Sequence, residues 1–240
     1  MVMPYIEGVV TVGGNPITQD VEVQGFDLSA PSYWGGFPSG GPDLIDYDVH
    51  SAVSLVDGSY TLANLTFGHA YMILVLSDDP SLEVKATFYG DVPDSASSIP
   101  IPVTGVISGI DIDCLPGDGT HPTGVTYNAP YDADYVEVAF FDPDLWINVG
   151  GCIGYPDDDF DLSILAELHA AQDYRVCYMA LDGSFDLVGI KFYKNKSWRN
   201  YGQANTVLGG ASGLRLNLGS YLTAIPMGSG AHFKVPRRRK

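Results

Sequence analysis

At 240 residues the chain has room for two ordinary domains, and its net charge of −17 argues against nucleic-acid binding by the folded part. Gly (28), Pro (16) and Tyr (15) are abundant while only 17% of residues are charged, which favours strands over helices. The longest clean apolar run, residues 70–76, is too short to cross a bilayer, and we expect no secretory leader at the N-terminus.

An internal repeat organises the chain. Residues 21–27 (VEVQGFD) return as 136–142 (VEVAFFD), and 60–65 (YTLANL) return as 160–165 (FDLSIL). Residues 70–75, 88–89 and 108–113 have counterparts, in the same order, at 173–178, 192–193 and 212–217. Apolar and polar residues alternate within these segments, which is typical of strands with one buried face. We therefore predict two copies of one β-rich unit.

The unit boundaries follow from turn-rich segments. We predict an immunoglobulin-like sandwich over 1–118, a second over 119–222, and a flexible basic tail over 223–240. A Gly-rich, aromatic stretch at 29–43 is expected to be a long exposed loop, and 163–172 a short helical turn. The fold class predicted is all-β, with two tandem immunoglobulin-like (prealbumin-like) β-sandwiches.

The first unit resembles the carboxypeptidase-regulatory-like, prealbumin-like or Cna-B type of immunoglobulin-like domain. The resemblance is carried by residues 6–17 (IEGVVTVGGNPI), 21–23, 57–65 (DGSYTLANL) and 108–113 (SGIDID). The second unit lacks the Gly-x-Pro-Ile opening and has Asp158 and Asp159 in place of Asp57 and Gly58. Domains of this family serve as spacers, adhesive modules and virion appendages, so the resemblance implies a fold and leaves these uses open.

Catalytic chemistry has no support in the sequence. His50, His69, His121, His169 and His232 stand singly, without the spacing of a zinc site, and no nucleophile motif occurs. We therefore predict a protein that is not an enzyme. Cys114, Cys152 and Cys177 form no CxxC pair, and they fit either buried thiols or a disulfide between Cys152 and Cys177.

Candidate binding residues fall into three groups. Partner contacts, or a glycan site, are expected at the aromatic loop, with the loop packing onto its own sandwich as the alternative; Trp146 and Trp198 could extend such a surface. The basic tail is expected to bind a neighbouring acidic subunit, with nucleic acid or simple solvation as rivals. Carboxylates near the unit ends fit either calcium or solvated loops, so no cofactor other than calcium is expected. The residues are, for the loop, Tyr33, Trp34 and Phe37; for the tail, Phe233, Lys234, Arg237, Arg238, Arg239 and Lys240; and for calcium, Asp111, Asp113, Asp118, Asp157 and Asp159.

The sequence thus predicts a structural assembly protein. Its partners would be subunits of the same homo-oligomer or lattice, with no membrane contact. Because no leader is visible and Met1 is retained, we expect a virion component such as a head-decoration or tail-fibre accessory protein, on the virion surface and made in the host cytoplasm. The alternative is an extracellular or cell-surface protein that is adhesive, binds carbohydrate or forms filaments.

Overall fold

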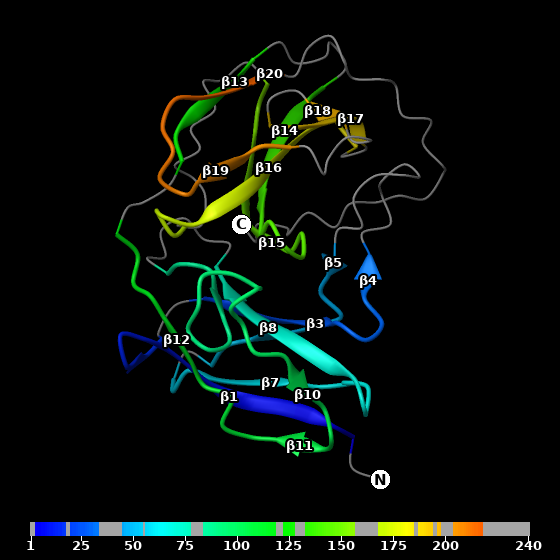
Figure 1. Cartoon of the computed structure of the whole chain (residues 1–240), viewed down its shortest axis with the longest axis vertical. Helices are drawn as coiled ribbons and strands as arrows, with labels where there is room; N and C mark the ends of the chain where they lie inside the picture. The colour runs from blue at the N-terminus through cyan, green and yellow to red at the C-terminus, as the bar shows by residue number, and fades with distance from the viewer. Residues whose placement is uncertain are drawn as a thin grey trace.

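A computed structural model describes the backbone of residues 3–17, 20–33, 45–54, 56–77, 84–118, 122–127, 133–156, 168–184, 187–193, 196–197 and 204–217. Within these ranges every regular element is a strand, and the strands form several sheets (Figure 1). The predicted all-β fold is confirmed. No described helix has the length and hydropathy needed to cross a bilayer.

Two sheets form the sandwich of the first unit, which we take as residues 3–118. In the first sheet, β1 (Tyr5–Val12) pairs antiparallel with β2 (Asn15–Pro16) and β7 (Ser59–Leu62), and parallel with β11 (Val106–Ile107) and β12 (Ile112–Cys114). The second sheet has the order β10 (Ile101–Pro102), β8 (Ala70–Leu76), β3 (Glu22–Asp27), β6 (Val49–Ala52), and β9 (Thr87–Phe88) also pairs with β8. Apolar side chains from both sheets fill the space between them, among them Ile6, Val10, Val23, Leu62, Ile73 and Ile112.

The second unit, residues 122–217, also has two described sheets. The third sheet is the parallel pair β13 (Gly124–Tyr127) and β20 (Leu214–Asn217). The fourth has the order β15 (Asn148–Gly154), β14 (Tyr135–Phe141), β16 (Asp173–Leu181), β17 (Leu187–Phe192), β18 (Lys196–Ser197), and β19 (Thr206–Leu208) also pairs with β16. Their shared core includes Val138, Phe140, Val176, Tyr178, Leu214 and Leu216.

Repeated sequence segments fold into matching strands of the two units. The 21–27 segment holds β3 and its repeat holds β14, each paired with a long central strand, β8 or β16. The 108–113 segment leads into β12 and its repeat into β20, each parallel to the strand that opens its unit. Both opening strands carry a glycine where a side chain cannot fit. A Cβ on Gly8 would lie 1.9 Å from the Ile110 oxygen, and one on Gly124 would lie 2.4 Å from the Leu214 oxygen.

One apolar cluster extends across both units, and Figure 1 shows the units stacked along the long axis of the molecule. Side chains alternate along β8, so that Ile73 and Val75 face the first sheet while Met72, Leu74 and Leu76 face outward. These outward residues, with Phe26 and Phe88, belong to the same apolar cluster as Leu168, Tyr174 and Val207 of the second unit. The second sheet is therefore buried on both faces.

The structure refines two of the predictions made from the sequence, the loop at 29–43 and the helical turn at 163–172. The 29–43 loop is not irregular throughout, because β4 (Ser32–Tyr33) begins within it and pairs antiparallel with β5 (Ile45–Asp46), just beyond its end. A helical turn was predicted at 163–172, and residues 163–167 of it are not described. Residues 168–172 include a tight turn, in which the Gln172 N–H donates to the His169 oxygen at 3.0 Å. The predicted unit boundaries stay a prediction, since residues 119–121 are not described.

Candidate functional site

One corner of the sandwich occurs twice, and both copies are built by a tyrosine hydroxyl. The hydroxyl of Tyr71 accepts the N–H of Thr66 at 3.1 Å, and that of Tyr174 accepts the N–H of His169 at the same distance. We call residues 66–71 the first corner and residues 169–174 the second corner. A tyrosine that bonds backward across five residues in this way is a feature of immunoglobulin-like sandwiches.

An aspartate lies at the end of the neighbouring strand in each unit: Asp27 is the last residue of β3, and Asp142 directly follows β14. Asp27 and Asp142 occupy equivalent positions in the repeat, and each accepts two backbone N–H groups of the turn that follows it. Their remaining contacts differ. The Asp27 carboxylate lies 2.6 Å from Nδ1 of His69, in its own unit. Asp142 instead receives the backbone N–H of Ser95 at 3.0 Å and also the Ser95 hydroxyl, both from the first unit.

The Asp27–His69 pair was not predicted, because 42 residues separate its members. Burial alone would raise the pKa of Asp27, but the bonds from His69, Ala30 and Ser29 outweigh it and lower that pKa. A carboxylate that orients an imidazole resembles part of a catalytic triad. However, the nearby Ser29 hydroxyl accepts the N–H of Ala70 at 3.0 Å, and this bond fixes the corner. The contacts favour a structural role.

The seam between the units is sealed by buried polar groups. Besides the Asp142–Ser95 contact, Nε2 of His169 lies 2.9 Å from the Ala86 oxygen. Lys85, which precedes Ala86, forms an ion pair of 2.7 Å with the exposed carboxylate of Asp118, and this pair lies within the first unit. Buried polar groups that find partners across an interface fix the relative position of its two sides.

His169 makes this seam sensitive to pH. Burial lowers its pKa, and nearby Lys85 adds to that effect, against the bond to Ala86. The native chain therefore binds a proton less tightly than the unfolded chain. The contribution of His169 to stability is fully present above the unfolded pKa of about 6.5. It is lost progressively as the pH falls below that value.

We expect wild type to lose more stability than His169→Gln as the pH falls from about 7 to 5, because glutamine does not titrate but retains a donor for Ala86. Urea unfolding at a series of pH values measures this, with His50→Gln as the control, because the His50 side chain is exposed on β6, away from the seam. Unfolding midpoints that fall in parallel for wild type and His169→Gln would contradict it.

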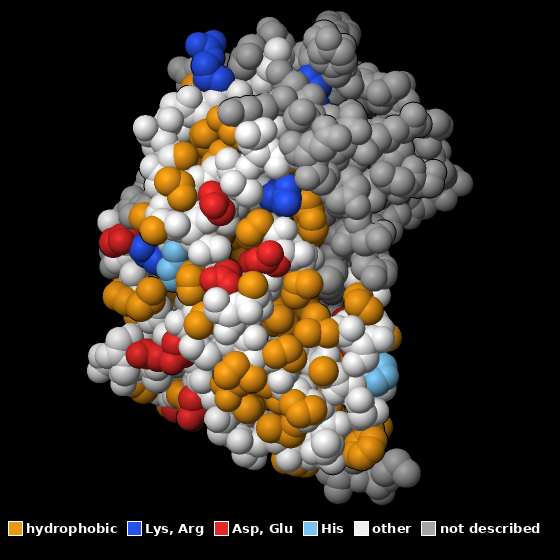
Figure 2. All heavy atoms as spheres, viewed as in Figure 1, with side chains coloured by type: hydrophobic (Ala, Val, Ile, Leu, Met, Phe, Trp, Pro, Cys, Tyr) orange, Lys and Arg blue, Asp and Glu red, His pale blue; other side chains and the backbone are white. Residues whose placement is uncertain are grey.

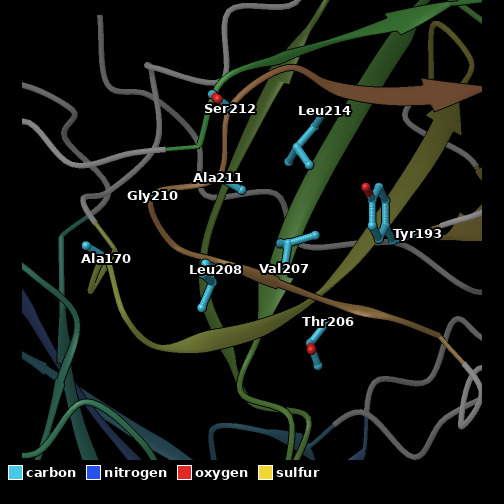
Figure 3. A pocket seen from close by; sticks show the side chains of 9 residues that line it. All are labelled: Ala170, Tyr193, Thr206, Val207, Leu208, Gly210, Ala211, Ser212 and Leu214. Atoms are coloured by element: carbon cyan, nitrogen blue, oxygen red, sulfur yellow. The ribbon is translucent and has the colours of Figure 1, made fainter.

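An open hollow of about 500 Å³ lies beside the second corner (Figure 3). Its lining is more apolar than polar, and Tyr193, Thr206 and Ser212 add hydroxyl groups. β19 borders it, and Leu208 at the end of that strand is 50% exposed. The apolar residues around the hollow are Ala170, Val207, Leu208, Ala211 and Leu214.

The described aspartates of the predicted calcium set bind other partners. Asp111 accepts the N–H of Val9 at 2.9 Å, and Asp118 pairs with Lys85. Asp113 accepts the N–H of Gly14 and the hydroxyl of Thr11, and these bonds lower its pKa. Within the described ranges no three His, Cys, Asp or Glu side chains gather as a metal ligand set. Asp157 and Asp159 lie outside these ranges, so calcium binding stays a prediction.

Most of the predicted partner-binding residues also lie outside the residues that the structure describes. Tyr33 belongs to β4, but its side chain is not described, and neither are Trp34, Phe37 and Trp198. The tail residues Phe233, Lys234, Arg237, Arg238, Arg239 and Lys240 lie outside as well. Trp146 packs against Phe192 with ring centroids 5.6 Å apart, and the Arg175 guanidinium lies 4.7 Å above its ring.

The three cysteines are buried free thiols, so Cys152 and Cys177 are not joined. Burial raises the pKa of Cys114 to about 12 and the pKa of Cys177 well above its usual value. A thiol that stays protonated is a poor nucleophile and a poor metal ligand at neutral pH. Cys114 and Cys177 therefore act as small apolar core residues.

Comparison with known proteins gives no family assignment. No family model matches the chain, and no curated protein does. Among solved structures, shaft pilin SpaA from Lactobacillus rhamnosus GG matches as a double mutant (TM-score 0.31, 10% identity), as the unmutated protein (0.29, 10%) and as a single mutant (0.26, 9%). Each match covers 92% of this chain and 100% of the pilin chain. At such TM-scores the assignment of a β-sandwich rests on the strand pairing described above.

Proposed function

We propose that this chain is a non-enzymatic structural or adhesive protein that works in an assembly with other copies of itself. The observation that carries the proposal is the continuous core across the seam. The outward face of the second sheet is buried against the second unit, and the Asp142–Ser95 and His169–Ala86 contacts close the seam. Such packing joins two sandwiches into one stiff body, which suits a spacer or shaft better than a pair of mobile domains.

Surface charge supports the same role. The first 120 residues hold sixteen acidic residues and one base, a net charge of −15, and the base, Lys85, is already paired with Asp118. Figure 2 shows hydrophobic side chains gathered over the part of the first unit around β8 and β10. A strongly acidic surface with apolar areas fits docking on proteins and disfavours nucleic acids.

We propose a carboxypeptidase-regulatory-like or Cna-B type for both units, on the sequence segments that carry that resemblance. We propose a setting outside the cell or on a cell surface, with the basic tail as a second contact to neighbouring copies. The virion setting expected from the sequence has no support in the strand pairing or in the comparisons, and a glycan remains the other candidate ligand.

Sedimentation velocity over a wide range of protein concentration, with electron microscopy of the largest species, tests the proposed function. We expect reversible growth into chains of stiff subunits. A protein that stays monomeric at its highest soluble concentration, or that shows turnover lost on replacing one Asp or His, would contradict it.

A further inference from the structure

We propose that the C-terminal segment of one copy, residues 218–240, binds an apolar patch on the first unit of the next copy, so that copies join head to tail. The proposal rests on the proposed function and names the two surfaces that carry it out. Exposed apolar side chains on the segment 99–106, and on the turn beside it, form the patch. Its residues are Phe67, Ile99, Pro100, Pro102 and Val106.

Hydrogen bonds hold the turn that carries Phe67 against the segment 99–106. The Gly68 N–H donates to the Val103 oxygen at 2.8 Å, and the Val103 N–H donates to the His69 oxygen at 2.8 Å. Phe67 is 69% exposed at the tip of this turn. Figure 2 shows hydrophobic side chains gathered around β10, which lies within the segment. Contiguous apolar surface of this kind, unlike scattered single residues, marks a contact site.

The patch is uncharged although the unit that carries it is strongly acidic. Residues 95–110 contain no Asp, Glu, Lys or Arg, whereas the unit holds sixteen acidic residues and one base. Carboxylates border this run: the Ser97 N–H donates to Asp94 at 2.8 Å, and the Ser108 hydroxyl donates to Glu7 at 2.7 Å. Both donors are neutral groups, so they do not balance the negative charge. A partner must therefore be apolar where it covers the patch and basic where it extends beyond it.

The C-terminal segment has this composition. It contains no acidic residue, and its five bases all lie in the last seven positions. Phe233 and Val235 flank the first of these bases, and the stretch before them has no Lys or Arg and includes Tyr221 and Leu222. Apolar side chains of the segment can cover the patch while the bases reach the carboxylates at its border.

Charge explains why the C-terminal segment, and not the folded body, makes the contact between copies. Without its five bases the chain carries −22, of which −15 lies in the first 120 residues and −7 in residues 121–217. Two folded bodies therefore repel each other whichever of their units meet. The segment carries +5, and the more acidic first unit attracts it more strongly than the second unit does.

The C-terminal segment leaves the body far from the patch. It begins after Asn217, the last residue of β20, and Figure 1 shows β20 at the end of the second unit that is remote from β10 and β11. Pairing two copies does not use up a contact between two distant surfaces, because each copy keeps one surface free. Such a contact propagates into a filament or closes into a ring.

A binding assay on full-length chains tests the contact. The acceptor is a variant in which glutamine replaces the five bases, so its patch stays intact while its own segment loses its charge. The probe is a fluorescent peptide of residues 218–240. We expect the peptide to bind, and to bind about 10-fold more weakly when Phe67→Ser and Val106→Ser are added to the acceptor. The replaced bases are Lys234, Arg237, Arg238, Arg239 and Lys240.

Matched controls separate the patch from other apolar surface. Val56→Ser and Leu208→Ser alter residues that are 91% and 50% exposed, in a different turn and in the second unit, and should leave binding unchanged. A peptide with Phe233→Ser and Val235→Ser keeps its charge but should bind about 10-fold more weakly. Equal binding by both peptides, an equal loss from the control substitutions, or binding to duplex DNA with none to the acceptor would each overturn the contact.

Sedimentation velocity tests whether the contact joins copies. Wild type should form species larger than dimers, and the five-glutamine variant should stay monomeric. An equimolar mixture of that variant with the full-length Phe67→Ser, Val106→Ser chain should form dimers and no larger species, because each supplies one intact surface. A mixture without dimers would show that the segment does not bind a neighbour's patch. If the five-glutamine variant assembles like wild type, this contact is wrong although assembly itself stands. A wild-type chain that stays monomeric at its highest soluble concentration overturns both.

Discussion

Gly8→Ala is expected to lower the free energy of unfolding by about 3 kcal/mol or more, at the upper end of what overpacking a core costs. The added Cβ would lie 1.9 Å from the Ile110 oxygen and 2.4 Å from its carbonyl carbon. These atoms cannot move aside freely. The Ile110 oxygen accepts the buried Tyr60 hydroxyl at 2.6 Å, and the Ile110 N–H donates to the Glu7 oxygen at 3.1 Å. Relief of the clash must break the parallel pairing of β1 with β12.

Gly109→Ala is the matched control, because Gly109 precedes Ile110 but an added Cβ there would meet no atom within 4 Å. Its φ of +76° makes alanine cost about 1–2 kcal/mol through backbone strain alone. Gly124→Ala should repeat the larger effect in the second unit, since its Cβ would lie 2.4 Å from the Leu214 oxygen. Urea unfolding measures all three variants. Equal losses for Gly8→Ala and Gly109→Ala would show that β1 and β12 do not approach this closely.

The sequence predicts the fold well because the fold depends on local patterns. Alternation along 110–114 and 214–218 indicates a strand with one buried face, and β12 and β20 lie there. The repeat of VEVQGFD as VEVAFFD identifies β3 and β14, and it even matches the two aspartates that close the following turns. Turn residues and alternation act over a few neighbours, so they are visible in one sequence.

The contacts of the candidate site could not be predicted, because they join residues that are far apart in the sequence. Asp142 meets Ser95 across 47 residues, and His169 meets Ala86 across 83. A single polar residue has no periodicity that points to its partner. The repeat itself held one unused signal: Phe67 and Ala170 occupy the same place, and an aromatic residue opposite alanine marks a position where the two units differ in surface shape. The predicted aromatic loop and basic tail fall largely outside the described residues.

Residues 1–119 expressed alone should unfold cooperatively but self-associate and bind a hydrophobic dye. The core between the first and second sheets remains intact in this half, which provides the cooperative transition. The outward face of the second sheet, however, loses its cover. Each large apolar side chain left bare forgoes about 1.5–3 kcal/mol of burial, and the exposed area promotes aggregation. The residues concerned are Phe26, Met72, Leu74, Leu76 and Phe88.

Leu74→Thr is expected to harm the full chain but to improve the behaviour of the isolated half. In the full chain Leu74 is completely buried against the second unit, so threonine should cost about 2–5 kcal/mol, as large-to-small core changes do. In the isolated half the same change places a β-branched polar residue on an exposed strand, which should reduce dye binding and self-association. Ile73→Thr is the control, because Ile73 faces the core of the first unit and should destabilise both proteins. If Leu74→Thr destabilises the half as much as the full chain, the second unit is not what covers this face, and the shared core that underlies the stiff two-unit body does not exist.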